Sequence, residues 1–258
     1  MRQLQQEGIF EMNSSGGSIE KAGELIRKAS LILPNSKVIK HSLSEWALKK
    51  SETAKTELER IKYVRESQRI SLELTREVAS TSFPFHTLIK IGIEELIKEI
   101  KTGDSATIER KIGEVERVIA NAQQHFPEDS YILAEESKYR QYISDDPQAR
   151  KLLEKAFENN KGNPYVAIRL ADLYEQDDSE KAIEVLSEAI DVRTGDKPLN
   201  YKLAILLQKY KPERKAAIKI HLKRAFTDGD SNYAAQFWYA RHIYLEELID
   251  DAYTYFKK

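Results

Sequence analysis

Residues 229–247, GDSNYAAQFWYARHIYLEE, bring a cluster of aromatic side chains together with a cation and an imidazole. Aromatic rings and a guanidinium are the groups that bind apolar, anionic or cationic partners, so this stretch could form a binding surface. The same residues could equally form the packed interior of a helix pair. The side chains concerned are Phe237, Trp238, Tyr239, Arg241, His242 and Tyr244.

The residues just upstream partly match a calcium-binding loop. Asp228, Asp230 and Asn232 occupy its first, third and fifth positions, but position six is Tyr233 where the loop needs glycine, and position 12 is not glutamate. An EF-hand is therefore not predicted. We expect Asp230 or Ser231 to cap the helix that follows.

The sequence contains no catalytic or metal-binding signature. Zero cysteines exclude disulfides and thiolate metal sites, and no phosphate-binding loop, dinucleotide fingerprint or nucleophile elbow is present. His41 and Glu45 are four residues apart, but HSLSE is not the His-Glu-x-x-His zinc pattern. His86 is interpreted as a packed histidine bonded to the backbone. We predict no catalytic residue, metal or cofactor; an enzyme with a dispersed site remains a third alternative to the two binding functions given below.

Composition indicates a folded, helical protein. The chain has 258 residues, 41% hydrophobic and 32% charged, with a net charge of −1. No apolar run approaches the roughly 18–20 residues that cross a bilayer, and the N-terminus lacks a signal-peptide core. These features predict a cytoplasmic protein without a membrane partner. The near-neutral charge argues against a nucleic-acid binder driven by bulk positive charge.

Small residues recur at helical spacing along the chain. Alanines seven residues apart lie two helical turns apart on one face, where they let a second helix approach closely. Pro34 and Pro127 each follow such an alanine by five residues. The alanines are Ala22 and Ala29, Ala122, Ala149 and Ala156, and Ala182 and Ala189.

These spacings resemble the tetratricopeptide repeat (TPR), a helix–turn–helix of about 34 residues. Ala171 is followed by Tyr174 three residues later and Ala182 eleven later, and Ala240 is followed by Ala252. The resemblance implies an all-α, right-handed solenoid whose concave surface is lined by the first helix of each hairpin. It is clearest at 3–34, 164–190 and 232–257.

We expect one TPR-like domain over residues 1–258, made of about seven hairpins. Asp146-Pro147 and Asn163-Pro164 each place a capping side chain before a proline at the first helical position. The chain starts and ends within helical sequence, so we expect it to be part of something longer or to dock its ends on a partner. The expected hairpins are 2–34, 36–79, 84–126, 129–159, 164–192, 198–226 and 232–257.

The TPR resemblance assigns groove-facing residues by repeat position. With Ala240 at the eighth position, the second, fifth, ninth and twelfth positions face the groove, while Trp238 and Tyr239 fall toward the packing side. Some TPR proteins bind a C-terminal carboxylate through Lys and Asn side chains at set groove positions. Asp172 and Ile205 at the ninth position do not match that pattern. The predicted partner-binding groove is Tyr165, Asp172, Glu175, Tyr201, Gln208, Phe237, Arg241 and Tyr244, with Ile168, Ile205 and Ala234 at equivalent positions.

Charge is unevenly distributed in the C-terminal half. Residues 172–191 hold eight acids and one base, and residues 211–224 hold six bases and one acid. The two runs could be solvated faces that attract each other, or the bases could form a contact strip for an acidic partner or an RNA backbone. The bases of this strip are Lys211, Arg214, Lys215, Lys219, Lys223 and Arg224.

A looser resemblance concerns HSLSEWAL, FPFHTLIKI and HLKRAFTDGDSNYAAQFWYAR. These stretches are similar to the C-terminal helical-repeat arms of large prokaryotic proteins that carry a sirtuin-like or nuclease effector and a STAND-type NTPase. The resemblance implies an anti-phage sensor. We therefore predict a non-enzymatic module, a scaffold or sensor arm that binds a protein or peptide partner or other domains of a longer chain. The alternative is an RNA-binding module that uses the 211–224 strip.

Overall fold

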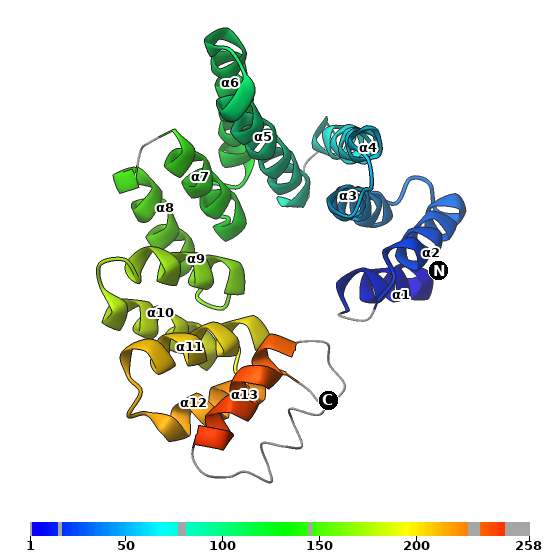
Figure 1. The fold of residues 1–258 in the computed structure, drawn as a ribbon. Helices are drawn as coiled ribbons and strands as arrows, with labels where there is room; N and C mark the ends of the chain where they lie inside the picture. Colours follow the sequence, from blue (N-terminus) through cyan, green and yellow to red (C-terminus); the bar gives the residue numbers. More distant parts are fainter. Residues whose placement is uncertain (1, 15–16, 77–80, 144–145, 227–232, 246–258) are drawn as a thin grey trace. The chain divides into compact units, whose positions relative to one another are not determined.

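The computed structural model describes residues 2–14, 17–76, 81–143, 146–226 and 233–245, apart from the side chains of 146, 233 and 243–245. Those residues form thirteen α-helices and contain no strand (Figure 1). The all-α fold class is therefore confirmed. The chain divides into two compact units, Met1–Asp145 and Asp146–Lys258, called unit 1 and unit 2. That they form one continuous domain stays a prediction.

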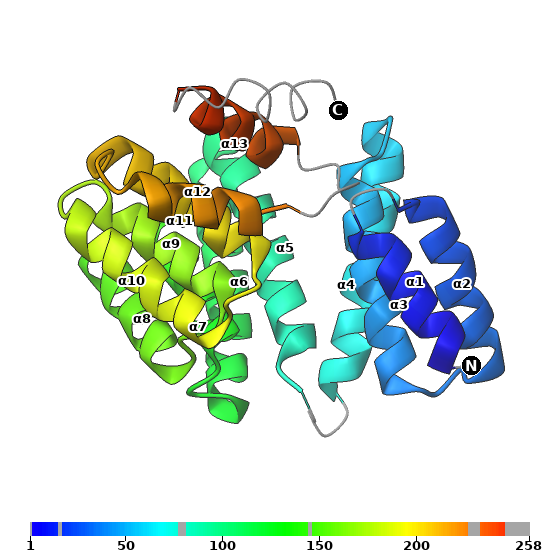
Figure 2. The same ribbon diagram turned by 90° about the horizontal axis from the view of Figure 1, so that it is seen from below.

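Unit 1 consists of helical hairpins joined by short connections. Within it α1 packs on α2, α3 on α4 and α5 on α6, each pair antiparallel (Figure 2). The hairpins expected at 2–34, 36–79 and 84–126 correspond to these pairs. The helices are α1 (Arg2–Asn13), α2 (Ile19–Ile32), α3 (Lys37–Glu52), α4 (Glu57–Arg76), α5 (Phe83–Thr102), α6 (Ser105–His125) and α7 (Ser130–Tyr142).

Unit 2 repeats the same plan. Here α9 packs on α10 and α11 on α12, as expected for 164–192 and 198–226. The hairpin expected at 129–159 gives one helix to each unit, and the second helix expected for 232–257 lies outside the described residues. The helices are α8 (Asp146–Asn159), α9 (Pro164–Tyr174), α10 (Ser179–Val192), α11 (Lys197–Tyr210), α12 (Lys215–Arg224) and α13 (Tyr233–Leu245).

Capping side chains fix where several helices begin. Asn163 precedes Pro164, and its Oδ1 accepts hydrogen bonds from the backbone N–H groups of Tyr165 and Val166, as expected. At the other pair, Asp146-Pro147, the aspartate was expected to precede the helix as its cap. Asp146 is instead the first residue of α8. The cap expected at residues 230–231 lies outside the described residues.

The alanines at helical spacing lie at the helix interfaces. All seven, including both members of each pair, have no exposed surface. The eighth-position residues Ala171, Ala204 and Ala240 are buried to the same degree. Since a larger side chain at any of these positions would push a neighbouring helix away, the alanine spacing sets how closely the hairpins stack.

First helices lie closer to one another than second helices do. In unit 1, α1 contacts α3, α3 contacts α5, and α5 contacts α7; in unit 2, α9 contacts α11. Among the described residues no comparable contact joins the second helices α2, α4 and α6, or α8, α10 and α12. Each stack therefore curves toward its first helices, which is the face expected to bind a partner.

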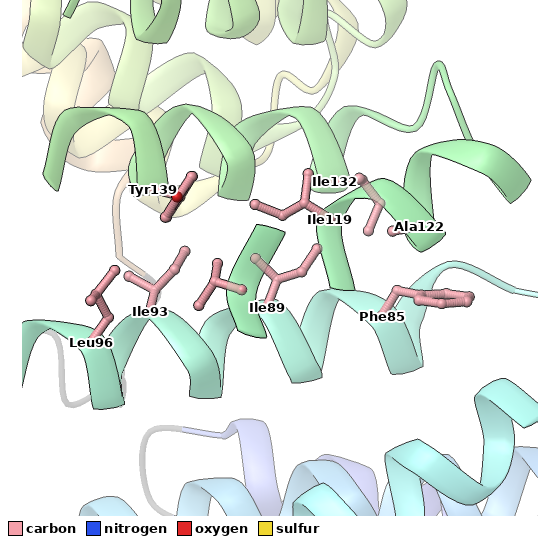
Figure 3. Close-up of a cluster of buried hydrophobic side chains, with 9 residues drawn as sticks. Phe85, Ile89, Ile93, Leu96, Ile119, Ala122, Ile132 and Tyr139 are labelled. Carbon is pink, nitrogen blue, oxygen red and sulfur yellow. The ribbon is translucent and has the colours of Figure 1, made fainter. Parts of the chain in front are cut away.

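A cluster of buried side chains in unit 1 shows how a first helix is held in place. Phe85, Ile89, Ile93 and Leu96 project from one face of α5 toward α6 and α7 (Figure 3). Tyr139 of α7 closes the cluster, and its hydroxyl donates a hydrogen bond to Glu116 at 2.9 Å. Burial raises the pKa of Tyr139, so this hydroxyl stays protonated. The cluster therefore anchors α5 between its own second helix and the first helix of the next hairpin.

Candidate functional site

The predicted groove residues of unit 2 lie on α9, α11 and α13 or, for Glu175, directly after α9, and those whose side chains are described are partly or fully exposed. Phe237 is 52% exposed, and Tyr201 and Tyr165 are half-buried. The side chain of Tyr244 lies outside the described part of the chain. The assignment of these residues to a partner stays a prediction.

Asp172 and Glu175 belong to an ion-pair network that joins α9 to α11. Lys202 Nζ lies 2.6 Å from Asp172 Oδ1 and 2.9 Å from Glu175 Oε2, and Lys209 Nζ lies 3.0 Å from Glu175 Oε1. The hydrogen bond from Lys202 is the main cause that lowers the pKa of Glu175. A partner that binds these two acids must share them with the lysines.

Sequence reasoning missed Lys202 and Lys209. Both lie on α11, and their role depends on α9 and α11 being neighbours, which no local pattern of the sequence reveals. Charge complementarity was the signal that could have revealed this contact. The acids Asp172 and Glu175 occupy the ninth and twelfth positions of one repeat, and the next repeat contains the two lysines. Because a position beside the groove can also serve the inter-repeat contact, groove position alone does not establish a binding role.

A pocket of about 420 Å³ lies between α11, α12 and α13. Its lining is mainly apolar, with three cationic side chains around it. Ile218 is 2% exposed and forms part of the floor. The lining residues are Ile205, Gln208, Lys209, Pro212, Lys215, Ile218, Trp238, Arg241 and His242. The pocket therefore brings together two predicted groove residues, Gln208 and Arg241, and one residue of the predicted basic strip, Lys215.

The aromatic stretch divides differently from the expectation. Tyr239 is buried against Phe226, with ring centroids 5.7 Å apart, so its predicted packing role is correct. Trp238 was also expected on the packing side, but it is half-buried and lines the pocket. The Arg241 guanidinium lies 5.2 Å from the centroid of its ring. The TPR repeat positions assign each residue either to the groove or to the core. Trp238 lies at the boundary between the two, so this assignment placed it incorrectly.

The predicted basic strip falls into parts with different surroundings. Lys211 forms an ion pair with Glu180, which joins the basic run to the acidic run as one interpretation expected. Lys215, Lys219 and Lys223 are spaced by four and share one side of α12. The backbone carbonyl of Lys215 accepts a hydrogen bond from His242 Nε2 at 3.1 Å, and Lys223 Nζ lies 5.6 Å from the ring of Tyr239. This line of lysines therefore follows the α12–α13 seam.

The histidines have structural environments. His86 Nε2 lies 3.2 Å from Oε1 of the buried Glu135, so this histidine bonds a carboxylate and not the expected backbone group. His41 Nδ1 lies 3.6 Å from Glu45, and burial lowers the pKa of His41. Within the described ranges no three His, Asp or Glu side chains are placed to hold a metal ion.

None of the helices in the described part of the chain is long and apolar enough to cross a membrane.

The stacked hairpins and their alanine interfaces define a TPR-like α-solenoid fold. No family model and no curated protein matches the chain. Among solved structures, TTC0263, a thermophilic TPR protein of Thermus thermophilus, aligns with a TM-score of 0.61 at 14% identity, covering 80% of this chain and 98% of that one.

Two further structures share the fold. PilF of Pseudomonas aeruginosa aligns with a TM-score of 0.53 at 14% identity, covering 85% of this chain and 88% of that one. Human IFIT1, solved as a dimer with m7Gppp-AAAA, aligns with a TM-score of 0.57 at 14% identity; the match covers 98% of this chain and 60% of IFIT1. At these identities the likeness is one of fold.

Proposed function

We propose that the chain is a non-enzymatic interaction module that binds a protein or peptide partner along the first-helix face of unit 2. The exposed aromatic side chain of Phe237 is the observation that carries this proposal. Aromatic residues in such positions are enriched among residues that dominate binding energy. TPR-like solenoids present extended concave surfaces of this kind.

Selection from a random-peptide display library against the full chain tests this function. We expect bound peptides to lose affinity about tenfold or more with Tyr201→Ala or Phe237→Ala, because loss of an aromatic anchor costs on the order of 1–2 kcal/mol. Fluorescence anisotropy measures the affinity. Val192→Ala is the matched control, since Val192 is 62% exposed on the second helix α10. Failure to select any peptide, or equal affinity for all variants, would contradict the proposal.

An RNA-binding role is the second candidate function, favoured by the line of lysines on α12. The IFIT1 structure with m7Gppp-AAAA makes it relevant for this fold. If Lys215, Lys219 and Lys223 contact phosphates, replacing all three by glutamine removes three of these contacts. The slope of log affinity for single-stranded RNA against log salt concentration should then become less negative by about 2. Anisotropy titrations of a labelled oligouridylate at several salt concentrations measure this slope. An unchanged slope would reject the strip as an RNA site.

A narrower proposal is that the module acts as a cytoplasmic sensor arm of an anti-phage defence protein. It rests on the sequence resemblance of the stretches around residues 41–48, 83–91 and 221–241. The complete open reading frame tests it: a fused effector or NTPase supports the arm, and a frame that encodes these 258 residues alone opposes it.

A further inference from the structure

The pocket between α11, α12 and α13 has an apolar interior and a cationic rim. Ile205, Pro212, Ile218 and Trp238 provide the apolar surface, and none of the nine lining residues is acidic. A volume of about 420 Å³ accommodates one large side chain with part of the backbone that carries it. The pocket therefore suits an apolar side chain surrounded by negative charge.

Two of the rim cations, Arg241 and Lys215, are not used in ion pairs within the described part of the chain. Both of these cationic side chains are exposed, and Arg241 lies over the Trp238 ring. The third cation, Lys209, shares its charge with Glu175 at 3.0 Å. Lys219 lies one turn beyond Lys215 on the same side of α12 and extends the positive charge away from the pocket.

We infer that this pocket recognises an acidic peptide segment that inserts one apolar side chain between α11, α12 and α13. Carboxylates on either side of that side chain pair with Arg241 and Lys215, and the inserted group covers Ile218 and the exposed part of Trp238. Charge complementarity selects the partner, and the apolar contact supplies most of the affinity. The inference rests on the proposed interaction function and adds the chemistry of the partner.

The lining favours a peptide over a nucleic-acid base. Base recognition uses flat stacking surfaces and several hydrogen-bonding groups. The Arg241 guanidinium already lies over the Trp238 ring, at 5.2 Å from its centroid. The aliphatic side chains of Ile205 and Ile218 bind an aliphatic or aromatic side chain equally well, and they select no base edge.

The composition of display-selected peptides tests this inference directly. Selection uses the full chain, and the selected sequences are expected to place Asp or Glu on both sides of a large apolar residue. The double variant Lys215→Glu/Arg241→Glu is expected to weaken these peptides at least tenfold, and Trp238→Ala to weaken them about fivefold or more. The matched control is Lys151→Glu/Lys155→Glu, which makes the same charge change at two exposed lysines of α8. Circular dichroism verifies that each variant retains its helical content.

Four results would overturn the inference. Selected peptides that lack acidic residues contradict it, and so do acidic peptides that bind both double variants equally. A labelled ten-nucleotide oligouridylate that binds more tightly than the peptides, with loss on Lys215→Glu/Arg241→Glu, assigns the pocket to RNA instead. Peptides that depend on Tyr201 but not on Arg241 refute this pocket assignment while leaving the proposed function intact, whereas a selection that yields no peptide refutes the proposed function itself.

Discussion

Trp46→Ala is expected to lower the free energy of unfolding of unit 1 by about 3–5 kcal/mol, because it removes a large side chain from a site that cannot collapse. Trp46 is 3% exposed, and its ring meets that of Tyr63 edge-on at 5.5 Å. Its Nε1 donates a hydrogen bond to the carbonyl of Ile19 at 2.7 Å, and Arg27 covers the ring at 4.4 Å. The one side chain therefore joins α2, α3 and α4.

Hydrogen exchange measured by mass spectrometry locates this loss. Amides of α2, α3 and α4 should exchange faster in Trp46→Ala, and urea denaturation gives the free energy. Leu31→Ala is the matched control, because Leu31 is 82% exposed on α2 and its removal leaves no cavity. A loss below about 1 kcal/mol would contradict the packing role. The chain has 2 tryptophans, so in this variant Trp238 alone reports fluorescence from unit 2.

Gly23→Ala tests the same contact without removing the ring. A Cβ at position 23 would lie 2.5 Å from Trp46 Cε2, and the ring is held by its hydrogen bond to Ile19. We expect a loss of about 1–3 kcal/mol from overpacking. Gly113→Ala is the control on α6, where an added Cβ meets no atom within 4 Å. That substitution is expected to be neutral or stabilising by up to about 1 kcal/mol.

Much of the fold follows from patterns within single helices. The alanines that recur every seven residues mark helix interfaces, and Asn163-Pro164 marks a helix start; both depend on residues close in sequence. Local spacing is sufficient here because hairpins pair helices that are neighbours in the chain.

The candidate site depended on contacts that no local pattern contains. The pocket combines Gln208 of α11, Lys215 of α12 and Arg241 of α13, and only the packing of three helices brings them together. The TPR register considers first helices alone, so it omitted Ile218 of the second helix α12. The register also treats each repeat by itself, so it could not show that Asp172 is paired with Lys202 of the next repeat.

Asn200→Ala is expected to lower the free energy of unfolding of unit 2 by about 2–4 kcal/mol, because it removes three hydrogen bonds made by one buried side chain. Asn200 has no exposed surface. Its Nδ2 donates to the carbonyl of Thr194 at 2.9 Å and to that of Asp196 at 2.8 Å. Its Oδ1 accepts from His221 Nδ1 at 2.8 Å, since the amide nitrogen is already used as a donor. The side chain thus fixes the α10–α11 connection and the position of α12.

Urea denaturation followed by hydrogen exchange of unit 2 amides measures this loss, and Asn160→Ala, at an exposed position of unit 2, should change the free energy by less than about 0.5 kcal/mol. His221→Gln gives a second readout through pH. Burial, and then Arg224, lower the pKa of His221 in the folded protein. The unfolded chain therefore takes up the proton first, and wild-type stability falls as the pH drops below about 6.5. His221→Gln should flatten this fall. Equal pH dependence in both proteins, or an Asn200→Ala variant as stable as Asn160→Ala, would show that the Asn200–His221 pair does not hold α12 against α11.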